Sequence, residues 1–133
     1  LVEYARNVLG IAQADHEESS PEASTLLISR LSCSLVGTIE TLSLMPGSAA
    51  SQIYEQDAVS EQFACNYGLN PLYRDVFEGS ALRVAGVGPE GEVRLVELTT
   101  HPFFLATLFL PQVRSSPGEP HPLIVAYLRA AVG

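Results

Sequence analysis

Three apolar, β-rich segments in the second half of the chain strongly limit what it can fold into. Residues 82–88 (LRVAGVG) and 92–98 (EVRLVEL) flank a short Pro-Glu-Gly connection, which is typical of a β-hairpin. After the loop at 99–102, the run FFLATLFL at 103–110 is almost continuously apolar, as in a strand buried on both faces. We therefore expect a sheet with a deeply buried strand.

Helical segments are expected on both sides of these strands in the sequence. Residues 1–10 place apolar side chains at helical spacing, and no residue that could cap a helix precedes Leu1, so we expect the start of this helix to be supplied by preceding sequence or a partner chain. At 70–79, Asn70 followed by Pro71 is a typical helix start. A last helix is expected to begin at His121-Pro122, with a core face made of Leu123, Ile124, Tyr127 and Leu128.

The other segments alternate between loops and short elements. The polar, acidic stretch 13–25 contains a proline and predicts a loop, whereas the apolar runs within 26–39 predict strands. Residues 45–50 predict a turn that leads into a short helix at 52–56. Strands and helices are mixed along the chain, which indicates an α/β fold.

Composition and charge exclude several classes of function. The 133 residues fit one domain or part of one, and 47% hydrophobic with 17% charged residues indicates a folded chain. The net charge is −8, and all seven basic residues are arginines. Such a surface repels phosphate backbones and anionic lipid heads, so we expect neither a nucleic-acid nor a membrane partner. No apolar run approaches the ~20 residues of a spanning helix.

The histidines and cysteines show no metal-binding pattern. No two of them have the spacing of zinc ligands, so we expect no metal and no cofactor. Cys33 and Cys65 lie in apolar surroundings without a neighbouring base, which predicts buried, inert thiols. Two cysteines and the lack of a signal-peptide pattern favour a reduced, cytoplasmic protein.

Three segments together resemble a known family. EYARNVLG (3–10), the run RVAGVGPEGEVRLVELTTHPFFLATLFLPQ (83–112) and PHPLIVAYLRAA (120–131) resemble the glutaminase domain of CTP synthase, in the order of that family. The resemblance implies an α/β class I glutamine amidotransferase fold, a flavodoxin-like three-layer sandwich with a mixed central sheet. It also implies that residues 1–133 form the C-terminal part of such a domain, lacking its N-terminal strands and the turn that carries the nucleophile.

The catalytic residues of that family are not reproduced here. Its triad uses a cysteine, which should lie a handful of residues before Leu1, and a histidine and glutamate in an F-H-P-E motif. That motif reads Phe109-Leu110-Pro111-Gln112 in this chain. Leu110 cannot accept a proton and Gln112 carries no charge to hold an imidazolium. Loss of a catalytic base typically costs about 10⁴-fold or more in triad enzymes.

The resemblance also points to three possible ligand-binding residues. In the family's basic stretch R-H-R-H-R-Y-E-V-N, the last arginine contacts the carboxylate of glutamine, and here residues 62–70 read QFACNYGLN. Asn66 takes the place of that arginine, while Tyr67 is retained. Asn66 can donate only a neutral hydrogen bond, so glutamine binding should be weakened. Glu18 corresponds to the glutamate that holds the amino group of the substrate, and a solvated charge run is an equal interpretation of it.

This pattern favours a catalytically inactive homologue, a pseudoenzyme with a scaffolding or regulatory role. Its binding surface would be the former active-site cleft, expected to be lined by Leu110, Phe63 and Cys65 and to suit an apolar ligand or a protein. The alternative is the glutaminase part of a CTP synthase-like ligase that supplies ammonia for the amination of UTP.

A third alternative is a domain that serves only to form oligomers. The expected partners are the N-terminal remainder of the same domain or a second chain, including a second copy in a homo-oligomer. Without them, the fold should expose an apolar sheet edge.

Overall fold

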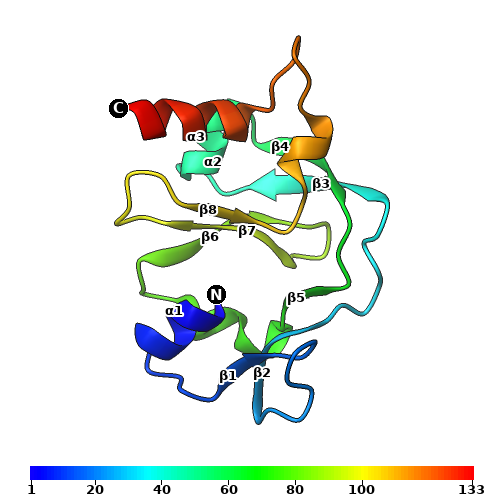
Figure 1. Cartoon of the computed structure of the whole chain (residues 1–133), viewed down its shortest axis with the longest axis vertical. Helices are drawn as coiled ribbons and strands as arrows, with labels where there is room; N and C mark the ends of the chain where they lie inside the picture. The colour runs from blue at the N-terminus through cyan, green and yellow to red at the C-terminus, as the bar shows by residue number, and fades with distance from the viewer.

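The computed structural model describes all 133 residues, which form two β-sheets and a set of short helices (Figure 1). The larger sheet has five strands in the order β4-β3-β6-β7-β8, and every neighbouring pair is antiparallel. The smaller sheet has the order β1-β2-β5, with β1 parallel and β5 antiparallel to β2. The strand bounds are Ala14–His16 (β1), Thr25–Arg30 (β2), Thr38–Leu44 (β3), Ala58–Phe63 (β4), Tyr67–Leu69 (β5), Leu82–Val87 (β6), Val93–Leu98 (β7) and Leu105–Thr107 (β8).

The helices lie on both sides of the five-stranded sheet. In Figure 1, α2 (Ala49–Tyr54) and α3 (Pro122–Val132) lie above this sheet, and α1 (Val2–Asn7) lies below it with the small sheet. Two short 3-10 helices, η1 (Pro71–Phe77) and η2 (Pro111–Arg114), complete the chain. None of the helices has the length and apolar character needed to cross a membrane.

Two hydrophobic cores form on opposite faces of the large sheet. The core under α2 and α3 contains Leu42, Phe63, Leu95, Phe109 and Leu123 among its buried members. The core on the other face contains Ala5, Ala14, Leu27, Phe77, Leu82 and Val96. Neighbouring residues Leu95 and Val96 thus point into different cores, because side chains alternate along a strand. The molecule is therefore built in three layers.

Strand β7, and not the run 103–110, is the strand buried on both faces. The prediction for 103–110 is wrong because only Leu105–Thr107 forms a strand, and its three residues are half-buried. This short strand, β8, is the edge of the sheet and has β7 as its single neighbour. The apolar run instead divides into the edge strand and the following Phe109, which packs into the core.

The predicted hairpin is confirmed, with Leu82 opposite Leu98 and Val87 opposite Val93. Asn70 also caps its helix as predicted, since its side chain accepts a hydrogen bond from the amide of Leu72. The helix is nevertheless a 3-10 helix. It ends at Phe77, two residues before Gly79, which has a positive φ of 74°.

Several other element predictions require correction. The acidic stretch 13–25 includes the parallel strand β1. Its partner β2 begins at Thr25, which pairs with Ala14 eleven positions earlier, and this pairing could not be found from local pattern. The short helix begins at Ala49, earlier than expected, because the side chain of Ser48 caps it. On α3, Leu123 is buried as predicted, but Tyr127 and Leu128 are more than half exposed because the second half of this helix extends beyond the sheet.

Buried polar groups connect the helical layer to the large sheet. The carboxylate of Glu61 on β4 accepts a hydrogen bond from the hydroxyl of Tyr54 at 2.6 Å, and its Oε1 lies 2.9 Å from Nε2 of His121. His121 also caps α3, since its Nδ1 accepts from the amide of Leu123. Burial, reinforced by the bond to Glu61, raises the pKa of Tyr54 above its usual value.

Truncation of Phe63 should be among the most damaging core substitutions. Its side chain is fully buried, and its ring packs edge-to-face against Phe109 at 5.9 Å. We expect Phe63→Ala to lower the free energy of unfolding by about 3 to 5 kcal/mol, measured by chemical denaturation. Leu72→Ala is the matched control, because Leu72 is 85% exposed and should change stability by less than about 0.5 kcal/mol. Equal losses of unfolding free energy in the two variants would contradict the burial of Phe63 in the core.

Tyr54 should remain neutral in the folded protein at alkaline pH. Its pKa is raised on folding, so the stability it provides is present below the ordinary tyrosine pKa of about 10 and is lost as the pH rises above it. We expect absorbance titration to show one tyrosine that ionises only when the chain unfolds. Tyr54→Phe should remove that phase, and titration of all five tyrosines together in the folded chain would contradict the prediction.

Candidate functional site

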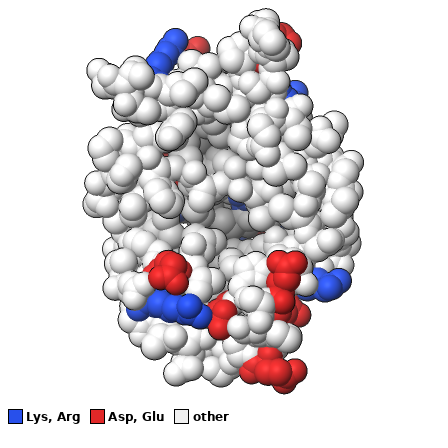
Figure 2. Space-filling model, in the orientation of Figure 1, with Lys and Arg blue, Asp and Glu red and all other residues white.

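A cleft of about 410 Å³ lies between the two sheets. Its walls are formed by the beginning of α1 and by residues of β5, β7 and β8, and most of them are apolar. Figure 2 shows a hollow in the middle of this face, surrounded mainly by uncharged atoms, with charged side chains gathered below it. The cleft therefore suits a ligand or polypeptide segment with a largely apolar surface.

Tyr67 is the one predicted ligand-binding residue that lines this cleft. It lies on β5 directly opposite Arg30 of β2, and the guanidinium of Arg30 lies over its ring, 5.5 Å from the centroid. The ring of His16 is 5.2 Å from the ring of Tyr67, and His16 also lines the cleft. Tyr67 is thus flanked by a cation and an imidazole at one end of an apolar wall.

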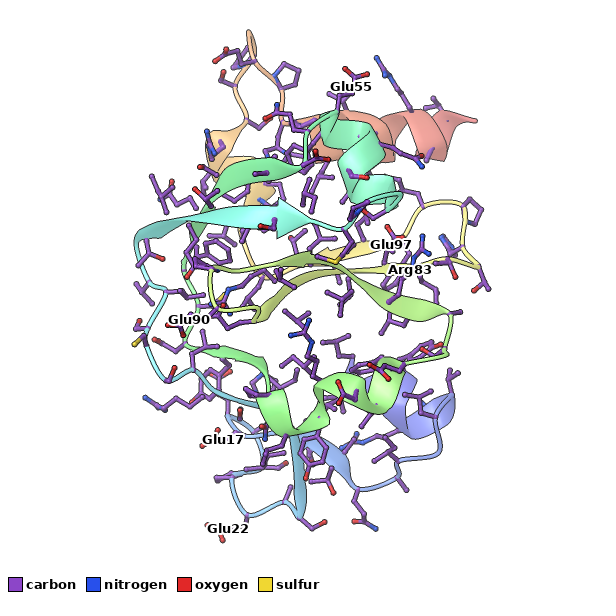
Figure 3. All side chains as sticks on the ribbon, turned by 180° about the vertical axis from the view of Figure 1, so that it is seen from behind. Glu17, Glu22, Glu55, Arg83, Glu90 and Glu97 are labelled. Carbon is purple, nitrogen blue, oxygen red and sulfur yellow. The ribbon has the colours of Figure 1, made fainter.

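The acidic loop places Glu18 close to His16 but outside the cleft. The amide of Glu18 donates to Nδ1 of His16 at 3.1 Å, while its side chain is exposed. The neighbouring Glu17 accepts a hydrogen bond from the amide of Arg30, which joins this loop to β2, and it lies in the lower part of Figure 3. Asp15 lies on β1 just before this loop, and the hydrogen bond from the amide of His16 is the chief cause that lowers its pKa.

Leu110 and Gln112 occupy the motif positions but do not line the cleft. Leu110 precedes η2, and its amide donates to the carbonyl of Gln62 at 2.9 Å. Gln112 lies on η2 with an exposed side chain. The pair offers neither a proton acceptor nor a charge, so no proton transfer can be assigned to these two positions.

The three residues predicted to line the former active-site cleft do not line this cleft. Phe63 is fully buried in the core below α2 and α3, and neither Leu110 nor Cys65 contributes to the cleft wall. Asn66 is exposed, and its carbonyl accepts from the amide of Leu31. The wall is instead formed by residues of β5, β7 and β8, because these strand ends face one another across the gap between the sheets.

A buried arginine forms part of the cleft wall, and no motif in the sequence marks it. The Arg94 guanidinium lies 3.0 Å from Glu40 and 3.4 Å from Glu92, and it stacks over the ring of Phe63. Gly88 permits this arrangement, because a Cβ there would lie 2.7 Å from a carboxylate oxygen of Glu92. Two carboxylates neutralise Arg94, so it is poorly suited to attract an anionic ligand into the cleft.

The two cysteines occupy different environments. Cys33 is exposed, contrary to the prediction of a buried thiol, because it lies in the loop between β2 and β3. Cys65 is half-buried, and its thiol donates to the carbonyl of Leu108 at 3.1 Å. No group of three or more metal-ligating side chains comes together anywhere in the chain.

Comparison with known proteins identifies what this architecture is related to. No protein-family profile matches the chain. The CTP synthase of Nostoc punctiforme is 33% identical over 142 residues, which cover 99% of this chain and 26% of that protein. The CTP synthases of Synechococcus sp. and Saccharolobus solfataricus are 36% and 33% identical, with 98% of this chain and 26% of each protein covered. The chain thus spans about a quarter of the length of these relatives.

A solved structure agrees closely with the fold. The Trypanosoma brucei CTPS glutaminase domain with bound acivicin superimposes with a TM-score of 0.90 and 25% sequence identity, over 98% of this chain and 55% of that one. This agreement places the chain in the α/β, flavodoxin-like glutamine amidotransferase fold, as predicted. Together with the sequence relatives, it shows that the chain is a homologue of the glutaminase domain of CTP synthase.

The two thiols should differ clearly in reactivity. We expect a small thiol reagent to modify Cys33 completely before Cys65 reacts, because Cys33 is exposed whereas Cys65 is half-buried and hydrogen-bonded. Mass spectrometry of the labelled chain measures this order, and Cys33→Ser is the control that should abolish the rapid phase. Equal rates at both cysteines would show that the β2–β3 loop and the β4–β5 connection are not packed as described.

Proposed function

We propose that this chain is a catalytically inactive, CTP synthase-like member of the glutamine amidotransferase fold, with a scaffolding or regulatory role. The observation that supports this most directly is the occupation of the two catalytic motif positions by Leu110 and Gln112. Removal of an imidazole and a carboxylate takes away the base and its orienting group at once. The side chain of Gln112 is exposed and that of Leu110 is a hydrocarbon, so neither position offers a replacement base.

We further propose that residues 1–133 form the C-terminal part of the domain and that the remaining part covers the cleft. Two observations support this division. Strand β8 is a half-buried edge strand with one free side, and the matched solved domain extends well beyond the part that aligns. An added strand along β8 would satisfy its unpaired backbone groups and shield the apolar cleft wall. A second copy of the chain is the alternative occupant.

The cleft would then be the surface on which this remaining part, or a second copy, binds. Its apolar wall, with Tyr67 between Arg30 and His16, suits a protein segment or an apolar ligand better than free glutamine. Asn66 is exposed. We propose that it takes the position of the family's arginine, where it supplies no charge for the carboxylate of glutamine. The lack of a disulfide between the two cysteines fits a reduced, cytoplasmic setting.

One observation favours the alternative that the chain is the glutaminase part of a ligase supplying ammonia to UTP. Arg30 forms no ion pair with a carboxylate, and it stacks on Tyr67 beside His16, so this end of the cleft keeps a cation and an imidazole. A divergent site could use these two groups in place of those lost at Asn66 and Leu110. Activity would then depend on His16.

We expect the protein, expressed as its full natural chain, to release no ammonia from glutamine above background. Isothermal titration should likewise show no millimolar or tighter binding of glutamine. Leu110→His/Gln112→Glu is the matched variant, and restored turnover would show that only these two side chains limit catalysis. Turnover by the natural chain that disappears in His16→Ala would contradict inactivity and support the ligase alternative.

A further inference from the structure

A second pocket, of about 440 Å³, lies on the helical side of the large sheet, away from the cleft. It is enclosed by β4, the end of α2, η2 and the start of α3, and its walls are mostly polar. None of the residues that line this pocket also lines the cleft. Its central group is the carboxylate of Glu61, whose side chain is only 3% exposed.

One oxygen of that carboxylate is saturated by neighbouring donors. Nδ1 of His121 accepts from the amide of Leu123, so the imidazole proton is on Nε2. Nε2 therefore donates to Oε1 of Glu61 at 2.9 Å, and the Tyr54 hydroxyl donates to the same oxygen at 2.6 Å. Two donors, one at the end of α2 and one at the N-cap of α3, thus hold Oε1 and leave Oε2 without a donor.

The other oxygen is buried and has no hydrogen-bond partner. Oε2 of Glu61 is the one such side-chain atom in the whole chain. The nearest cationic group is Nη1 of Arg114 at 4.0 Å, too far for a hydrogen bond. A buried carboxylate oxygen without a donor is unfavourable, so this atom is a strong acceptor for any group that can reach it. Arg114 and Glu61 both line the pocket.

We propose that this pocket binds a small organic cation, a primary alkylammonium, whose N–H groups donate to Oε2 of Glu61 in place of Arg114. Glu119 also lines the pocket, so two carboxylates oppose one guanidinium and an anion is disfavoured. Val59 and Pro120 provide an apolar surface for a short alkyl chain.

Arg114 controls access to the carboxylate. Its side chain is 46% exposed and is carried by the four-residue helix η2, so it can turn into solvent without disturbing a packed core. The ion pair is long, at 4.0 Å, and its arginine is half exposed to solvent, so Arg114 is held only weakly. Arg114 is therefore a competitor of the ligand. Its removal should strengthen binding, whereas removal of the Glu61 charge should weaken it.

The test is a titration of the isotope-labelled chain with propylammonium, followed by NMR shifts of the Leu123 amide and the His121 ring. We expect saturable shifts, with at least about tenfold weaker binding in Glu61→Gln, the loss expected for one charge-assisted hydrogen bond. Arg114→Ala should bind about twofold to fivefold more tightly, the range of a surface ion pair. Glu78→Gln and Arg129→Ala carry matched charge changes on exposed residues elsewhere and should leave affinity unchanged.

Three further probes separate the parts of this proposal. Tetramethylammonium lacks N–H donors and should bind at least about tenfold more weakly, and propanol, which lacks the charge, should not saturate the site. Ammonium ion should bind more weakly than propylammonium, because it makes no contact with Val59 and Pro120.

Each opposite result overturns the proposal. If ammonium ion binds as tightly as propylammonium, the alkyl chain contributes nothing and the proposal of an organic ligand is wrong. If no saturable shift is seen, the pocket binds no alkylammonium and Oε2 is hydrated by water. If Glu61→Gln does not fold, Arg114→Ala still tests the proposal. This variant is expected to bind propylammonium more tightly, and unchanged or weaker binding would show that Arg114 does not compete with the ligand.

Discussion

Burial of β7 between two hydrophobic cores is the constraint on which the rest of the structure depends. Leu95 faces the helices and Val96 faces the small sheet, so this strand joins the layers. Its two charged residues are buried as well and have to be paired. Glu97 accepts from the amide of Ala49 at the start of α2 and forms an ion pair with Arg83 at 2.7 Å, visible in Figure 3. Because a buried charge without a partner is very costly, these pairs fix where α2 and the β6 strand can lie.

The sequence predicts the local parts of this architecture well and the long-range parts less well. The hairpin around residues 88–92 and the cap at Asn70 depend on residues close in the chain, and both are found where expected. The parallel pair β1 and β2 and the edge position of β8 depend on which segments meet in space. An apolar run such as 103–110 indicates that its side chains are buried. It does not indicate whether they are buried on a central strand, on an edge strand or in a loop that packs against the core.

The candidate site shows the same division between motif and placement. Family resemblance located the positions of Leu110, Gln112, Asn66, Tyr67 and Glu18, but only Tyr67 faces the cleft. Side-chain direction follows from the sheet twist and from packing, which a motif does not encode. His16 and Arg94 were missed, since one lies in an acidic stretch and the other alternates with apolar residues like an outward-facing charge. Gly88, Glu40 and Glu92 indicate that Arg94 is buried and paired, but only once the pairing of the strands is known, because these residues meet Arg94 in space.

The backbone of the motif at 109–112 and the side chains at 110 and 112 have separate physical roles, so the fold does not depend on the residue types at these two positions. The amide of Leu110 bonds the carbonyl of Gln62, and Phe63 and Phe109 form a β-bridge and an edge-to-face pair. These interactions use main-chain atoms and buried rings, and none requires a histidine at 110 or a glutamate at 112. By contrast, the buried Glu61 holds Tyr54 and His121 in the interior, where loss of one partner would leave a polar group unsatisfied. Selection for stability alone would therefore preserve the Glu61 cluster and leave positions 110 and 112 free to change.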